Sequence, residues 1–424
     1  MVVSVSSTLV NVAEDAELRL VSLLADAAVA PVASNFALAC ESCVSAGDAA
    51  KLLHTIVNDK NAISALMVIE TTEAVSALSL LAALLDRVKA GEAQLATAVA
   101  DAVLNAEGAA SGEEQAAVDR KITLLSVLYN MRSDSKEKCS LLRRMILLAG
   151  KFADTFLNED STLGMLLSEE NASLVIPTKP RLVALLESWN VPDNDRRDLY
   201  QQVASVITVT DKRKQRFLLL LLQSYKTQID APAMQAAKDA AVGAIRDPVS
   251  LFVHQRSMLA LPAIQALAKD SKTALLSGLL KVFLEGKLSD YQDFCTANGG
   301  EAAVLSPWGL DAAHCQRHMK ILSLCTLGSE HEEIPYAVIA ETLQLPETIQ
   351  VETWVIAAVG SGLLQAKMDQ LAQKVMVERC VVRRFDMDQW KALQSRLELW
   401  KTNVGSVLAT LKQSQAGSAT VSSN

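Results

Sequence analysis

Aromatic residues are scarce in this chain: they make up 4% of its 424 residues, whereas hydrophobic residues make up 50%. Charged residues account for 21%. This composition is typical of a packed globular protein and excludes an intrinsically disordered chain. Because alanine and leucine dominate the first half and both favour helices, we expect a mainly helical protein of roughly two to four domains.

Long hydrophobic runs are also missing. The longest starts at Phe217 and continues as leucines to Leu222, far short of the ~20 residues that a membrane span needs. No basic residues precede the apolar residues of the first segment, so a secretory signal is not expected. Seven scattered cysteines, an odd number, indicate reduced thiols rather than a disulfide framework. We therefore expect a cytoplasmic protein without a membrane partner. The cysteines are Cys40, Cys43, Cys139, Cys295, Cys315, Cys325 and Cys380.

An excess of positive charge is absent as well. The net charge is −8 and the isoelectric point is about 5.3, which argues against a protein that coats nucleic acid with a basic face. Four local basic clusters remain: residues 212–216, Arg143–Arg144, Arg196–Arg197 and Arg383–Arg384. They are either solvated helix ends and faces or a weak electrostatic contact with RNA or a ribosomal surface.

Motifs for catalysis or metal binding are weak. Cys40 and Cys43 have the spacing of a metal or redox pair, but no second close pair completes a four-ligand zinc site. His314 and His318 lie one helical turn apart, but Cys315 stands where a zinc protease needs glutamate. The sequence has no GxxxxGK phosphate loop. We expect core thiols, a surface helix face, no cofactor, no metal and no enzyme.

Most of the chain has the pattern of successive amphipathic helices joined by short loops, including residues 48–59, 73–88, 181–190 and 233–247. Such helices predict a solenoid of helical hairpins, which needs a terminal cap. We expect an N-terminal helical repeat region over 1–200, a second domain over 201–380 with repeats in 201–300, a winged helix over 308–385, a final helix over 386–413 and a disordered tail over 414–424.

The segment Tyr336–Asp369 predicts two short helices, a turn and a strand, and a second strand follows from Lys374. This is the pattern of a winged helix. Between Ser329 and Val359, however, there are six glutamates and neither lysine nor arginine. Since duplex binding requires cations that neutralise phosphates, we expect no sequence-specific DNA binding and instead a structural and protein-binding module.

Seven apolar residues of the last helix repeat at intervals of three and four without a break. This spacing predicts a seam for a coiled coil or a helical bundle, and therefore a partner-binding surface. We call these residues the seam: Trp390, Leu393, Leu397, Trp400, Val404, Val407 and Leu411.

A helical solenoid, a winged helix and a long last helix together resemble the PCI-domain family. The resemblance rests on residues 244–267 with their Asp-Pro pair, on 275–294, on 318–328 and on 385–411 with Trp390 and Trp400. Within this family the chain is most similar to members of eukaryotic translation initiation factor 3. The alanine-rich residues 1–120 match only loosely.

The resemblance implies a non-catalytic scaffold that associates with other PCI and MPN subunits of the factor and, through the complex, with the small ribosomal subunit. It implies support of mRNA and initiator tRNA recruitment in translation initiation. Two alternatives stay open: a PCI subunit of the COP9 signalosome or proteasome lid, and a nucleic-acid-binding winged-helix protein.

Overall fold

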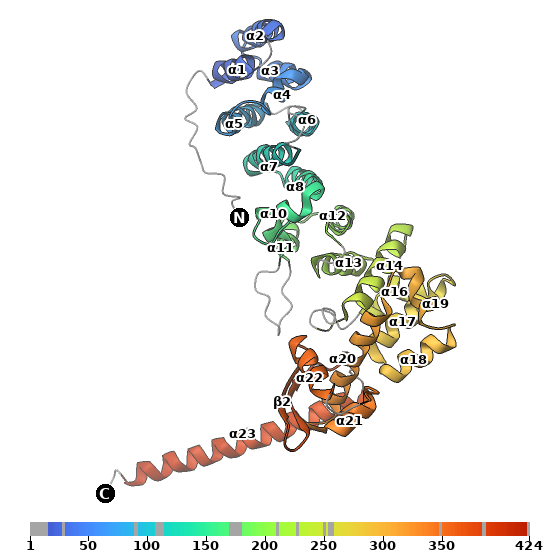
Figure 1. Ribbon diagram of the computed structural model, residues 1–424. Coiled ribbons are helices and arrows are strands. Elements are labelled where there is room, and N and C mark those ends of the chain that lie inside the picture. The colour runs from blue at the N-terminus through green and yellow to red at the C-terminus, as the bar shows by residue number, and fades with distance from the viewer. Residues whose placement is uncertain are drawn as a thin grey trace. The chain divides into compact units, whose positions relative to one another are not determined.

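A computed structural model gives the fold of the chain (Figure 1). The residues that it describes are 16–27, 30–88, 92–106, 114–168, 180–208, 212–225, 229–248, 252, 258–346, 350–383 and 387–421. The chain divides into two compact units, Met1–Ala240 and Ala241–Asn424. None of the described helices is both long enough and apolar enough to cross a bilayer.

Within the described residues, the first unit is built of helices that pack on one another, many of them on close neighbours in sequence, as the blue-to-green ribbons of Figure 1 show. This packing covers the apolar stripes of the helices and buries leucines such as Leu52, Leu81 and Leu125. The helices are α1 Ala16–Ala27, α2 Ala30–Ser45, α3 Ala49–Asn58, α4 Lys60–Ala65, α5 Thr71–Arg87, α6 Glu92–Asn105, α7 Glu114–Met131, α8 Ser135–Ala149, η1 Gly150–Phe152, α9 Ala153–Phe156, α10 Thr162–Leu167, α11 Arg181–Ser188, α12 Asp193–Val206, α13 Lys212–Ser224 and α14 Ala231–Arg246, which continues into the second unit.

The second unit joins short helices to a winged helix and a long last helix. Its helices and strands are η2 Met258–Ala260, α16 Pro262–Lys269, α17 Ala274–Glu285, α18 Leu288–Ala297, α19 Glu301–Leu305, η3 Ser306–Trp308, α20 Ala312–Glu330, β1 Glu333–Pro335, α21 Tyr336–Thr342, α22 Gln350–Gly360, β2 Leu364–Asp369, β3 Lys374–Cys380 and α23 Met387–Val421. Tyr291 and Phe283 lie in its core, with their rings edge to face at 5.7 Å. The predicted fold class is confirmed: the protein is mainly α, with a winged helix and a long C-terminal helix.

The sheet of the winged helix has the antiparallel order β1-β3-β2. β3 is central and pairs Val375 with Ile334 of β1 on one side and with Met368 of β2 on the other. The wing turn is held by Asp369, whose carboxylate accepts the backbone N–H groups of Leu371 and Ala372 at 3.1 and 3.0 Å. These bonds fix the tip of the wing. In the strand order given above, β2 lies at one edge of the sheet.

The helix predicted over residues 48–59 matches α3, because a polar cap marks its start. Asp48 caps α3 by accepting the backbone N–H of Lys51 at 3.0 Å, and α3 ends before Asp59. Pro335, whose ring favours the start of a helix, precedes α21 directly. From the sequence we also expect Asp211 to cap the helix that follows it, a helix over 250–261 and a loop over 108–115; Asp211 and most residues of the other two segments lie outside the described residues.

Pro262 begins α16, because proline fits the first helical turn. Two predictions need correction. The domain limit expected after residue 200 falls inside α12, which packs on α13, and the compact unit continues to Ala240. The tail expected to be disordered from residue 414 is helical up to Val421, since its alanines and the absence of proline allow α23 to continue.

Gly164 tests this packing, because a Cβ atom there would overlap the backbone carbonyl oxygen of Asn158. We expect Gly164→Ala to lower the free energy of unfolding by about 1–3 kcal/mol, the usual cost of overpacking. The matched control is Gly405→Ala on α23, where a Cβ meets nothing within 4 Å. This control should leave stability unchanged or raise it by up to about 1 kcal/mol.

The measurement is urea unfolding followed by far-ultraviolet circular dichroism. If Gly164→Ala unfolds at the same urea concentration as the unmodified chain, Gly164 does not lie as close to the Asn158 carbonyl oxygen as described.

Candidate protein interface

The seam is exposed along α23. The exposed fractions of its seven side chains run from 38% for Leu393 to 67% for Trp400. Figure 1 shows α23 as one long helix that continues beyond the winged helix. Apolar residues repeating on one face of an exposed helix, two of them tryptophans, form a surface suited to a partner helix.

The second helix of the winged helix, α22, has neither lysine nor arginine, whereas a DNA-binding protein needs cations there. Val351, Val355 and Ala358 are fully buried against the core, while Ile356 is 61% exposed. Trp354 is half-buried, with Lys320 Nζ 5.0 Å from the centre of its ring. This arrangement disfavours insertion of α22 into a nucleic-acid groove.

The glutamates around α22 form contacts within the winged helix and with the preceding helices. Glu333 pairs with Lys374 at 3.4 Å, and Glu330 pairs with Lys287 at 3.4 Å. Glu352 accepts hydrogen bonds from Gln370 at 3.0 Å and from the Tyr336 hydroxyl at 3.4 Å. Glu347 lies outside the described residues. The carboxylates therefore support the wing and give this face a negative charge.

Arginines of the basic clusters are engaged in contacts inside the protein. Arg143 donates to the side-chain oxygen of Gln202 at 2.7 Å, and Arg144 pairs with Asp101 at 2.9 Å. Arg197 donates to the carbonyl oxygen and the hydroxyl of Ser224 at 2.7 and 3.1 Å. Its guanidinium lies 4.6 Å from the centre of the Tyr225 ring. These contacts favour the interpretation as helix faces over a contact with RNA.

Arg383 was not recognised from the sequence, where it looks like half of a solvated basic pair; Arg384 lies outside the described residues. Arg383 Nη2 donates to the carbonyl oxygen of Phe283 on α17 at 2.7 Å. Its Nη1 donates to the carbonyl oxygen of Leu322 and to the Thr326 hydroxyl on α20, at 3.1 and 2.9 Å. One side chain thus ties the segment between β3 and α23 to two helices.

Arg383 stays charged although it is largely buried. Burial lowers the pKa of its guanidinium to about 10, which still leaves it protonated at neutral pH. The ring of Phe252 lies 5.6 Å from the guanidinium carbon and covers it further. An arginine that donates to three acceptors in this way holds the segment that follows β3 in place.

Two cysteines lie under the end of the same strand. Cys380 Sγ is 3.0 Å from the carbonyl oxygen of Cys325, which is fully buried on α20. A hydrogen bond between the two thiols, together with burial, raises the pKa of Cys325, and the same thiol–thiol bond lowers the pKa of Cys380. The helix approaches the sheet closely at Gly328, where a Cβ would lie 3.1 Å from Leu364 Cδ1. The thiols fill this narrow space as small apolar groups.

The candidate metal motifs are packed as predicted or lie on a helix surface. Cys40 and Cys43 are buried on α2, and burial raises the pKa of Cys40 to about 11, so both are core thiols. His314 is exposed on α20. His318, whose ring centre is 6.1 Å from that of His314, is half-buried, and burial lowers its pKa. Across the described residues no group of three or more metal-ligating side chains was found.

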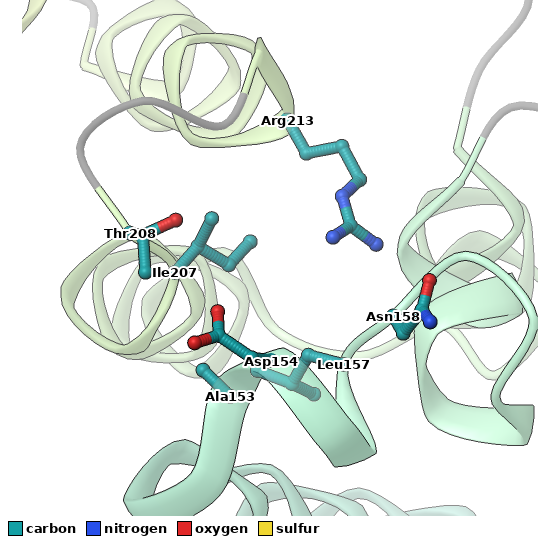
Figure 2. A pocket seen from close by; sticks show the side chains of 7 residues that line it. All are labelled: Ala153, Asp154, Leu157, Asn158, Ile207, Thr208 and Arg213. Atoms are coloured by element: carbon teal, nitrogen blue, oxygen red, sulfur yellow. The ribbon is translucent and has the colours of Figure 1, made fainter.

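A pocket of about 330 Å³ lies in the first unit. Figure 2 shows the Arg213 side chain reaching toward it from α13, with Asp154 and Asn158 on another side. Its lining also includes Thr208 and Ile207 after α12. These residues supply one carboxylate and one guanidinium, and no nucleophile–base pair is among them. The pocket therefore gives no support to catalysis, and the seam remains the stronger candidate site.

Comparison with known families agrees with this geometry. Residues 308–379, the winged helix, match the model of the PCI domain. This part of the chain is therefore similar to PCI domains. Residues 383–411 match a second model, described as the C-terminal helix of eIF3 subunit M. This match begins at Arg383 and ends at Leu411, the last residue of the seam.

Curated relatives carry the name eukaryotic translation initiation factor 3 subunit M. The chain is 34% identical to the protein of Dictyostelium discoideum over 239 residues, covering 54% of this chain and 57% of the relative. It is 27% identical to that of Phaeosphaeria nodorum over 298 residues, covering 69% and 62%. It is 32% identical to that of Chaetomium globosum over 249 residues, covering 56% and 57%. The chain thus spans less than two thirds of the length of these relatives. The matches agree with the resemblance that its residues predicted.

Replacing Arg383 tests the junction before α23. We expect Arg383→Met to lower the free energy of unfolding by about 2–3 kcal/mol, because it removes donors from partly buried carbonyl oxygens. It should also speed proteolytic cleavage between β3 and α23. The matched control is Arg379→Met, which removes an exposed cation from β3 and should change stability by less than about 0.5 kcal/mol.

Urea unfolding and limited proteolysis with mass spectrometry of the fragments measure both effects. Equal behaviour of the two variants would show that Arg383 does not hold the junction.

Proposed function

We propose that this protein is a non-catalytic scaffold, the M subunit of eukaryotic translation initiation factor 3, acting in the cytoplasm. The observation that carries the proposal is the exposed seam on a helix that matches the C-terminal helix model of that subunit. The PCI match over the winged helix and the names of the relatives support it.

In this proposal, the seam joins α23 to helices of other PCI and MPN subunits in a bundle. Trp400 and Leu397 are 67% and 55% exposed, and large side chains of this kind dominate binding once a partner covers them. Burying an apolar side chain stabilises an assembly by about 1.5–3 kcal/mol, so a seam of this length supplies enough free energy for a stable complex.

The winged helix offers a second contact. β2 is an edge strand, with β3 on one side and no described strand on the other. An exposed edge presents backbone N–H and C=O groups that a strand of another chain can pair with. We propose that a neighbouring PCI subunit adds a strand here, next to β2. The complex then binds the small ribosomal subunit and supports recruitment of mRNA and initiator tRNA.

A tagged full-length chain recovered from cytoplasmic extract, with mass spectrometry of the proteins that accompany it, tests the proposal. Initiation factor subunits and small ribosomal proteins are the expected result. Recovery of COP9 signalosome or proteasome lid subunits would contradict the assignment to initiation factor 3 and keep the PCI scaffold. Recovery of nucleic acid without these proteins would contradict both.

Charged residues in the seam should release the protein from its complex. We expect Leu393→Glu, Leu397→Glu and Trp400→Glu, combined in one chain, to reduce recovery of the partner subunits at least tenfold, because carboxylates cannot be buried in an apolar interface. The side chains are exposed, so the circular dichroism spectrum and thermal unfolding of the rest of the protein should be preserved.

The matched control is Leu399→Glu. Leu399 is 63% exposed but lies away from the seam in the heptad pattern. This variant should recover the partners as the unmodified chain does. Unchanged recovery with the triple variant would show that α23 does not bind its partners through the seam.

A further inference from the structure

The positions beside the seam carry a charge pattern of one sign. With Trp390, Leu397, Val404 and Leu411 at heptad position a, Arg396 takes position g and Lys401 takes position e. Both are exposed, and the Arg396 side chain is 80% accessible. The e and g positions face the partner across a coiled coil, so their charges decide which helix pairs with the seam.

Carboxylates are absent from these flanking positions. Between residues 387 and 421 the chain has only Asp388, at position f, and Glu398, at position b. Glu398 accepts a hydrogen bond from Gln394 within the same helix at 3.0 Å. The contact nearest to Arg396 is Glu332 at 4.0 Å, an exposed pair that is worth little and easily replaced.

A second copy of the chain fits this seam poorly. In a parallel pair, position g of one helix faces position e of the next heptad on the other helix, five residues further along. Arg396 and Lys401 are five residues apart, so two copies would place these cations against each other twice. In an antiparallel pair, e faces e and g faces g, which again offers no carboxylate to either cation. Like charges at these positions oppose pairing.

We infer that the seam binds one helix of a different chain, whose apolar heptad is flanked by carboxylates opposite Arg396 and Lys401. The selection acts at the middle of the seam, between Leu393 and Val404. Further along, position e is Leu408, which is 52% exposed and widens the apolar stripe without adding charge. The inference rests on the proposed role of the seam as the docking surface, and it names the chemistry of the partner.

The test uses two synthetic helical peptides with the same Leu-rich heptads, one with Glu and one with Lys at positions e and g. Fluorescence anisotropy measures the binding of each labelled peptide to the full-length chain. We expect the Glu peptide to bind at least tenfold more tightly than the Lys peptide in about 50 mM salt. The difference should shrink as salt shortens the range of the interaction.

A variant with Arg396→Glu and Lys401→Glu should reverse the preference. The matched control combines Lys391→Glu and Lys412→Glu, which make the same change of net charge at two b positions, away from the seam. This control should keep the preference for the Glu peptide. Equal binding of the two peptides, or no binding of either one, would overturn the inference.

Self-association through the seam would overturn the inference as well. It would be seen if sedimentation velocity showed a dimer of the chain and the seam triple variant did not form that dimer. The outcome is separate from that of the proposed function. If the peptides are selected by charge but the tagged chain recovers no initiation factor subunits, the proposed function fails and the partner chemistry stands. If the subunits are recovered but the peptides are not distinguished, only the partner chemistry fails.

Discussion

The constraint on which this structure depends is that each amphipathic helix must cover its apolar stripe with a neighbour. In the first unit the neighbours come from the chain itself, and residues such as Leu53 and Leu125 are fully buried between paired helices. The same residue types repeat on α23, yet its leucines and valines are largely exposed. Because exposed apolar surface of this extent is unfavourable in water, we propose that another chain covers this face of α23.

Arg383 holds the segment that follows β3. Its bonds to Phe283, Leu322 and Thr326 secure this segment to α17 and α20. A segment that is already ordered has less conformational entropy to lose on assembly. The side chains that we propose to bind a partner and the residue that orders the preceding segment are therefore different kinds of group: the seam is apolar and exposed, whereas Arg383 is charged and enclosed by its acceptors.

The sequence predicted what depends on local patterns. The sequence shows the helix that begins at Asp48, the hairpin of β2 and β3 and the spacing of the seam. Each of these features is set by residues that lie within a few positions of one another. β1 was missed because Glu333–Pro335 is too short to show alternation, and its pairing with β3 depends on residues forty positions away. Arg383 was missed for a similar reason: its acceptors are carbonyl groups, which every residue has, on helices that only the fold brings near.

The winged helix of this protein has the fold of DNA-binding winged helices, but its side chains are not suited to binding DNA. A recognition helix that reads DNA needs cations on its outer face, whereas α22 exposes Ile356 and carries Glu352 with neither lysine nor arginine. Carboxylates at this position repel phosphates, but they do not prevent backbone pairing at a sheet edge. In the partner binding that we propose for α23, the cations that matter for recognition are Arg396 and Lys401. Charge on that helix selects among protein partners, because an apolar seam alone would accept any helix with a matching heptad.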